Sequence, residues 1–189
     1  MLLIIALLYP EAESSFRWSK SFALFLFLFA ALTDWLDGWL ARRFGQVSDF
    51  GKFMDALADK VLTLGMFTSL LALGALPIWA LFPILLILSR ELLITGLRLV
   101  AAGKGKTLEA EKIGKLKTVI QLTCISLSLA KLSVESDFTS MMSQDSLELT
   151  LSILDFSTAS TLILATLITV LSGVVYLTKY WRFFLDEEK

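Results

Sequence analysis

Long apolar runs constrain the fold of this 189-residue chain more than any other feature. A membrane-spanning helix needs roughly 20 apolar residues, because each backbone amide must find its hydrogen bond inside the segment. Hydrophobic residues make up 56% of the sequence and charged residues 19%, against about 25% charged residues in soluble proteins. The sequence therefore predicts an all-α integral membrane protein, with residues 1–189 as a single transmembrane domain. The runs of sufficient length are Ser21–Arg43, Phe53–Leu73, Ile78–Arg98, Ile113–Leu132 and Leu149–Tyr180.

A further apolar run at the start of the chain is much shorter. As a helix, Met1–Tyr9 would span about 14 Å, roughly half of the hydrocarbon core. It lacks the positively charged segment that opens a signal peptide. We therefore expect a six-helix bundle whose first helix is truncated. The polar segment Glu135–Glu148 is expected to connect the last two spans, and the sequence assigns it no function.

Two pairs of carboxylates interrupt the apolar sequence. Asp34 and Asp37 are three positions apart and share one helix face, while Asp55 and Asp59 are four positions apart and share another. A carboxylate at membrane depth is costly, so it usually has a function. Hard divalent cations prefer carboxylate oxygens, and Mg²⁺ often combines them with substrate phosphates. The two pairs therefore predict a metal site, for one or two ions, that handles phosphates.

Two other interpretations of the aspartates remain open at this point. They could form structural ion pairs with basic residues at the same helix ends, or act as the relay of a cation or proton transporter. Small residues favour the metal-site interpretation over these two. Gly38, Ala41 and Gly51 leave room for a flat ligand, or for the backbone of another segment, to lie against the helix faces that carry the aspartates.

Composition excludes several other kinds of site. The chain has no histidine, which removes Ser-His and Cys-His triads and histidine-containing zinc sites. The single cysteine, Cys124, excludes an internal disulfide. A net charge of −1 gives no basis for nucleic-acid binding. Carboxylates therefore remain the main candidates for metal or base chemistry.

The acidic segments also resemble a known signature. Asp34, followed by Asp37-Gly38-x2-Ala41-Arg42-x8-Gly51-x3-Asp55-x3-Asp59, is similar to the motif of the CDP-alcohol phosphotransferases. Ser89–Arg98, Ile113–Thr118 and Ser172-Gly173 resemble stretches of the bacterial phosphatidylglycerophosphate synthases of that family. The likeness extends from about Phe25 to Arg182. The chain departs from the family at Ala56, where a proline is usual, and lacks the usual amphipathic segment before the first helix.

The resemblance implies a six-helix membrane enzyme, working as a homodimer among membrane lipids. Such an enzyme transfers the phosphatidyl group of CDP-diacylglycerol to sn-glycerol 3-phosphate and releases CMP. The implied cofactors are Mg²⁺ or Mn²⁺, as two ions held by the four aspartates. Asp59 would also take the proton of the attacking hydroxyl. The implied donor-binding residues are Asp37, Gly38, Ala41, Arg42 and Gly51.

Basic residues further along the chain predict where the acceptor binds. A guanidinium offers two parallel donors and an ammonium offers a point charge, and both suit a phosphomonoester. This feature favours glycerol 3-phosphate, while inositol phosphate, phosphatidylglycerol and serine remain the alternative acceptors of a sister enzyme. Charges snorkelling to the membrane surface are the competing interpretation. The predicted acceptor-phosphate residues are Arg90, Lys115, Lys117, Arg98 and Lys60.

The distribution of charge predicts the orientation in the membrane. Lysines and arginines gather at the connections on the side of the aspartates, whereas the opposite side carries the acidic run from Glu135 to Glu148. Because positively charged connections stay in the cytoplasm, the aspartates are expected to face the cytoplasm from the inner or plasma membrane.

Overall fold

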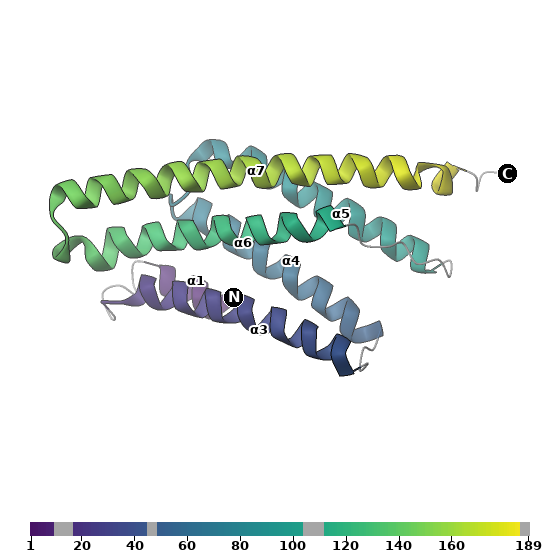
Figure 1. The fold of residues 1–189 in the computed structure, drawn as a ribbon, viewed down its shortest axis with the longest axis horizontal. Coiled ribbons are helices and arrows are strands. Elements are labelled where there is room, and N and C mark those ends of the chain that lie inside the picture. Colours follow the sequence, from purple (N-terminus) through teal and green to yellow (C-terminus); the bar gives the residue numbers. More distant parts are fainter. Residues whose placement is uncertain (10–16, 45–48, 104–111, 186–189) are drawn as a thin grey trace.

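The computed structural model describes residues 1–9, 17–44, 49–103 and 112–185. Within these ranges, the side chains of residues 35, 38–39, 41–42, 44, 49–57, 59, 112–115 and 181–185 lie outside the description. The described residues form helices and turns and contain no strand, which confirms the all-α prediction (Figure 1). The α-helices are α1 (Leu2–Leu8), α3 (Ser19–Phe44), α4 (Asp49–Ala72), α5 (Leu81–Gly103), α6 (Lys112–Ser133) and α7 (Gln144–Leu185).

Three helical segments of the described chain are long and apolar enough to cross a membrane. They are Ile78–Gly103, Leu116–Met141 and Gln144–Tyr180, and they agree with the last three predicted runs. Each includes large apolar side chains that remain exposed, such as Phe82, Val119 and Phe156. Such a surface suits contact with lipid tails rather than with water. The count of six spans stays a prediction.

The segment Glu135–Glu148 differs from its predicted role as a simple connection. Residues Val134–Phe138 continue α6 as one π-helical turn, Thr139–Met141 form a 3₁₀ turn, and α7 begins at Gln144. The polar residues of this segment therefore lie mostly in helical turns. Polar composition misled the prediction because exposed turns of a long helix can also be polar.

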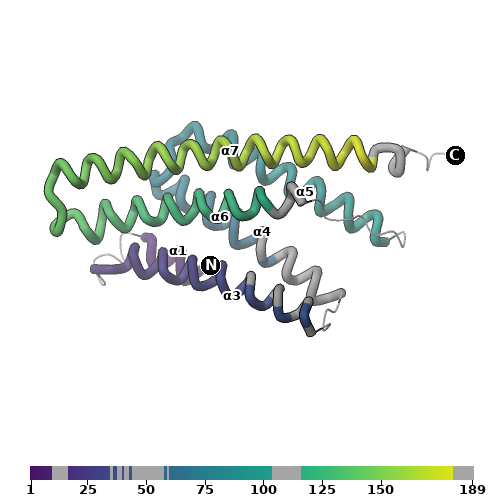
Figure 2. Tube along the Cα trace, in the orientation of Figure 1, coloured from purple at the N-terminus to yellow at the C-terminus, as the bar shows by residue number. Residues whose placement is uncertain are grey.

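Helices α6 and α7 form a long antiparallel hairpin that organises the molecule (Figure 1, Figure 2). Helix α6 also packs against α3 and α4, and α7 packs against α5. Each of the five long helices contributes to the apolar core, through Phe27, Phe67, Ile87, Ile125 and Leu162, all of which are buried. Close packing of these side chains holds the helices together, since lipid tails are as apolar as the core.

A tight turn at Gly74 reverses the chain between α4 and α5. Gly74 has φ of +71°, a conformation that side chains with a Cβ rarely adopt. The amide of Gly74 bonds to the carbonyl of Leu71 (3.1 Å), and that of Ala75 bonds to the carbonyl of Leu70 (3.0 Å). These bonds satisfy the last carbonyls of α4 in the way a glycine helix end usually does.

A buried carboxylate ties the start of α3 to the end of α6. Asp137, in the π-helical turn, accepts hydrogen bonds from the backbone amide (2.7 Å) and the hydroxyl (2.5 Å) of Ser21. The Ser21 hydroxyl also lies 2.7 Å from that of Ser133. The amides of a first helical turn have no partner within the helix, so Asp137 caps α3 from a distant part of the sequence.

Candidate functional site

The first pair of predicted metal ligands lies in the second half of α3. Asp34 and Asp37 are both exposed and are three residues apart, as the sequence predicts. The second pair, Asp55 and Asp59, belongs to α4, with side chains outside the described part. The structure therefore places the two acidic pairs on consecutive helices, and the convergence of all four carboxylates stays a prediction.

A cavity of about 330 Å³ lies between these two helices next to Asp34. Ala58, which directly precedes Asp59, lines the same cavity from α4. Alanines on both helices leave the space open, because their side chains are short. The cavity thus joins the first acidic segment to the second. Its described lining consists of Met1, Ala30, Ala31, Asp34, Ala58, Val61, Leu62 and Leu122.

The described donor set is consistent with a hard cation but does not form a complete site. Asp34 and Asp37 supply only oxygen atoms, the ligands that Mg²⁺ and Mn²⁺ prefer. Among the side chains that the structure describes, no three acidic, cysteine or histidine residues are grouped closely enough to hold a metal ion. The predicted donor-binding residues Gly38, Ala41, Arg42 and Gly51 have side chains outside the described part.

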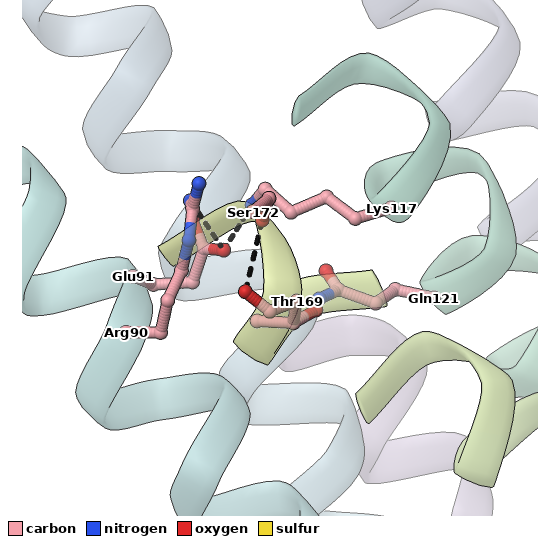
Figure 3. Close-up of polar contacts among 6 residues, drawn as sticks. All are labelled: Arg90, Glu91, Lys117, Gln121, Thr169 and Ser172. Atoms are coloured by element: carbon pink, nitrogen blue, oxygen red, sulfur yellow. Dashed lines mark hydrogen bonds and ion pairs between the residues drawn. The ribbon is translucent and has the colours of Figure 1, made fainter. Parts of the chain in front are cut away.

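The second feature of the site is a buried carboxylate that two predicted phosphate-binding residues share. Arg90 of α5 and Lys117 of α6 both donate to Oε1 of Glu91, the arginine from Nη1 at 3.4 Å (Figure 3). The side chains of Lys117 and Glu91 are only 8% and 11% exposed. The structure therefore brings Arg90 and Lys117 together, as predicted, around an acid whose central role the sequence did not predict.

Neutral polar groups from α6 and α7 surround this ion-pair cluster. Gln121 donates to the hydroxyl of Thr169 across 3.4 Å, and Ser172 donates to the backbone carbonyl of Thr169 at 2.9 Å (Figure 3). All three residues are buried. Sequence reasoning missed Gln121 and Thr169, although an amide in the middle of an apolar helix is a signal that could have identified Gln121.

Gly173 lets Arg90 lie against α7. A Cβ built on Gly173 would be 3.0 Å from Cγ of Arg90, closer than side-chain carbons normally approach. The glycine therefore provides the space that the arginine stem occupies. This gives a physical reason for the Ser172-Gly173 pair that the sequence singled out.

A very small cavity links the Glu91 cluster to the second acidic segment. Its volume is about 10 Å³, enough for a single water at most, and its lining includes Lys60 and Thr63 of α4, Glu91 of α5 and Gln121 of α6. Lys60 directly follows Asp59 in α4. The predicted acceptor residues therefore lie beside the helix that carries Asp55 and Asp59.

The remaining predicted acceptor residues have different outcomes. Arg98 lies on α5 two turns beyond Arg90, and its guanidinium carbon is 5.5 Å from the ring centre of Tyr176 on α7. Lys115 has its side chain outside the described part. No sequence signal distinguished Tyr176 from the aromatic residues that anchor membrane helices.

Comparison with known proteins identifies the family. A family model described as CDP-alcohol phosphatidyltransferase matches residues 1–171. The chain belongs to the CDP-alcohol phosphatidyltransferase family. The match confirms the resemblance carried by the acidic signature, and it extends beyond that signature over α5, α6 and most of α7.

Three curated relatives are each named CDP-diacylglycerol–glycerol-3-phosphate 3-phosphatidyltransferase. The protein from Bacillus subtilis is 36% identical over 158 residues, which is 83% of this chain and 72% of the relative. The protein from Cereibacter sphaeroides is 37% identical over 58% of this chain and 50% of the relative. The protein from Sodalis glossinidius is 37% identical over 58% and 61%. The matches to the latter two therefore span about half to three fifths of those relatives.

Proposed function

We propose that this family member transfers the phosphatidyl group of CDP-diacylglycerol to sn-glycerol 3-phosphate, giving phosphatidylglycerophosphate and CMP. The names of the curated relatives support this reaction. The observation that carries the choice of acceptor is the cluster of Arg90, Lys117 and Glu91 next to Lys60 of α4. Cations gathered beside the acidic segments suit an acceptor that carries a phosphate of its own.

The aspartates would bind and orient the donor. Asp34, Asp37, Asp55 and Asp59 are the proposed ligands of two Mg²⁺ or Mn²⁺ ions, which when bound neutralise the charge of the donor diphosphate. The alanine-lined cavity beside Asp34 supports this placement, because it lies between the two acidic segments.

The remaining parts of the acidic signature would hold the nucleotide and manage the proton. Gly38, Ala41 and Gly51 would let the CDP moiety lie close to the helices, and Arg42 would pair with a donor phosphate. The acceptor hydroxyl oxygen forms a bond to the β-phosphorus while the bond from that phosphorus to CMP breaks. Asp59 takes the proton of the attacking hydroxyl.

The basic cluster would bind the acceptor phosphate. Glu91 holds Arg90 and Lys117 near each other before substrate arrives, so their positive charge is already organised. The Arg90 guanidinium can offer two parallel donors to a phosphate and Lys117 a point charge. Lys60, Lys115 and Arg98 would complete the pocket.

The setting of this reaction is also part of the proposal. We place the site at the cytoplasmic face of the inner or plasma membrane, on the basis of the charge asymmetry between the two sets of connections. The exposed apolar surfaces of the spanning helices would contact membrane lipids and the acyl chains of the donor. We further propose that residues 1–189 act as one catalytic domain within a homodimer.

The decisive experiment measures CMP release by the purified protein in detergent. The protein is incubated with CDP-diacylglycerol, with Mg²⁺ or Mn²⁺, and with one acceptor at a time. We expect release with glycerol 3-phosphate, loss of release on chelation, and loss in an Asp55→Asn variant that remains folded. Asp145→Asn, a change at an exposed position of α7, is the matched control and should keep full activity.

Other outcomes of the same experiment would overturn parts of the proposal. Release only with inositol phosphate, phosphatidylglycerol or serine would keep the family reaction and replace the acceptor. Full activity of Asp55→Asn would contradict the metal assignment. Metal or proton flux without CMP release from any acceptor would contradict the transferase reaction itself.

A further inference from the structure

A buried carboxylate lies at the opposite end of α3 from the acidic signature. Asp137, in the π-helical turn after α6, is 1% exposed, and no basic side chain of the described residues pairs with it. Burying an unpaired charge is costly, so this carboxylate needs a positive partner. The basic residues of the neighbouring segments contact other groups: Arg17 contacts Ser140, Lys20 contacts the carbonyl of Leu8, and Lys131 contacts Glu135 and Asp155.

Hydrogen bonds to Asp137 reach only one of its two oxygens. Oδ2 accepts bonds from the backbone amide and the hydroxyl of Ser21, at 2.7 and 2.5 Å. A hydroxyl has one proton to donate, and that of Ser21 goes to Asp137, so the Ser133 hydroxyl donates to Ser21 across 2.7 Å. These donors are directed at the carboxylate, as they are around an anion. Oδ1 is buried without a hydrogen-bond partner among the described residues, and it remains available to a ligand.

Two serine hydroxyls close to this carboxylate in the sequence also lack partners. Ser136 directly precedes Asp137, and Ser19 lies two residues before Ser21 in the first turn of α3. The hydroxyl oxygens of both serines are buried and make no hydrogen bond within the part of the chain that the structure describes. Ser19 is 0% exposed. Three unpaired oxygens therefore lie within two residues of the contact between Ser21 and Asp137, and such atoms usually indicate an absent water or ion.

The charge of the carboxylate favours an ion over a water molecule. A water would satisfy the hydrogen-bonding groups but would leave the negative charge, of which the first turn of α3 offsets only about half. A monovalent cation balances a single carboxylate and can contact several oxygens at once. Mg²⁺ brings twice that charge and usually keeps several waters, which ligand atoms this deeply buried do not accommodate. Between the common monovalent cations, the smaller Na⁺ needs less room than K⁺ between packed helices.

We propose that Asp137, Ser19 and Ser136 form a Na⁺ site between the first turn of α3 and the π-helical turn. Oδ1 of Asp137 supplies the negative charge, and the two hydroxyls supply neutral oxygen ligands. The location fits this role, because π-helical turns often occur at functional sites and interrupted helices often coordinate Na⁺. Ser21 and Asp34 are 13 residues apart, about 20 Å along α3, so the site is separate from the acidic signature.

The first test measures the thermal unfolding midpoint of the purified protein in detergent. Choline chloride holds the ionic strength constant, so that general screening does not change. NaCl should raise the midpoint more than KCl does, because Na⁺ binds the folded state. Ser19→Ala should weaken the apparent Na⁺ affinity about tenfold, and Asp137→Asn should abolish the response. Ser128→Ala is the matched control, because the buried Ser128 hydroxyl bonds to the carbonyl of Cys124 within α6 (2.9 Å), and its response should equal that of wild type.

Ser19→Ala also separates loss of the ion from loss of the fold. Without Na⁺, this variant should be at least as stable as wild type, because it removes only an unpaired buried hydroxyl. The difference between the two proteins should therefore emerge only as Na⁺ is added. Equal responses to NaCl, KCl and choline chloride would overturn the Na⁺ site and favour an ordered water at Oδ1. Equal Na⁺ responses in wild type and Ser19→Ala would overturn the assigned ligands.

Direct binding measurements determine where the ion lies. The purified protein should bind radioactive Na⁺ in a scintillation proximity assay, and unlabelled NaCl should displace it whereas choline chloride should not. Binding should persist in Asp55→Asn and in excess Mg²⁺. Loss of binding in Asp55→Asn, with unchanged binding in Ser19→Ala, would place the ion at the acidic signature and overturn the site. Neither assay measures transfer, so protein that binds Na⁺ but releases no CMP would refute the proposed function alone.

Discussion

Replacing Glu91 with glutamine should destabilise the protein far more than other charge-neutralising changes. The carboxylate receives hydrogen bonds from both Arg90 and Lys117, and the side chains of these three residues are between 8% and 13% exposed. Glutamine keeps the size of the side chain but removes the negative charge. Removing one partner of a buried ion pair typically costs about 3–5 kcal/mol, because the remaining charge is left in a poorly solvated place.

The unfolding free energy of Glu91→Gln should be measured by titration with SDS in mixed micelles. Glu135→Gln is the matched control, because Glu135 contacts Lys131 at 3.7 Å but its side chain is 39% exposed. An exposed pair of this kind contributes only about 0.5 kcal/mol. A double variant, Glu91→Gln with Lys117→Met, should recover part of the loss, because one excess charge is also removed. A loss in Glu91→Gln no larger than that in Glu135→Gln would refute the argument.

Two further predictions follow from single contacts. Gly173→Ala places a Cβ 3.0 Å from Cγ of Arg90, so the substitution should raise the acceptor KM several-fold. Gly96→Ala is the control, because its Cβ meets no atom within 4 Å and the acceptor KM should stay unchanged. Equal kinetics in the two variants would contradict the space-filling role of Gly173. Asp137→Asn weakens the cap on α3, so it should lower the unfolding free energy by about 1–3 kcal/mol without altering either KM. The control Asp145→Asn, at an exposed position, should change the unfolding free energy by less than about 1 kcal/mol. A loss of activity in Asp137→Asn protein that is fully folded would show that the cap affects the reaction.

The spanning helices could be predicted because bilayer thickness fixes the length of an apolar run. The predicted run Ile113–Leu132 differs from α6 by one residue at each end, since charged and polar residues flank it. The apolar pattern could not predict the first five residues of α7. Four of these five residues are polar, and they are helical because α7 continues beyond its apolar part.

The candidate site, like the fold, could be predicted from the sequence only in part. Local spacing was enough to predict that Asp34 and Asp37 share a face, whereas the phosphate pocket expected of Arg90 and Lys117 stays a prediction. It could not identify the residues that complete each cluster, because those contacts join distant parts of the chain. Glu91 and Lys117 are 26 residues apart, and Ser21 and Asp137 are 116 apart. Such pairs depend on how the helices pack, and a single sequence does not encode that packing in any local pattern.

Glu91 and Asp137 are the two buried acids among the residues whose side chains the structure describes, and they lie near opposite ends of α6. Their substitution should therefore affect different properties of the protein. Lys117, the partner of Glu91, and Ser133, which contacts the Ser21 that Asp137 caps, are separated by 16 residues, about 24 Å along that helix, with the apolar core between them. At that separation, two substitutions that share no partner should add within about 0.5 kcal/mol. In the double variant Glu91→Gln with Asp137→Asn, the loss of unfolding free energy should therefore equal the sum of the losses in the two single variants. The acceptor KM of the double variant should equal that of Glu91→Gln alone. A coupling above about 1 kcal/mol would mean that the helices transmit a shift from one end of the bundle to the other.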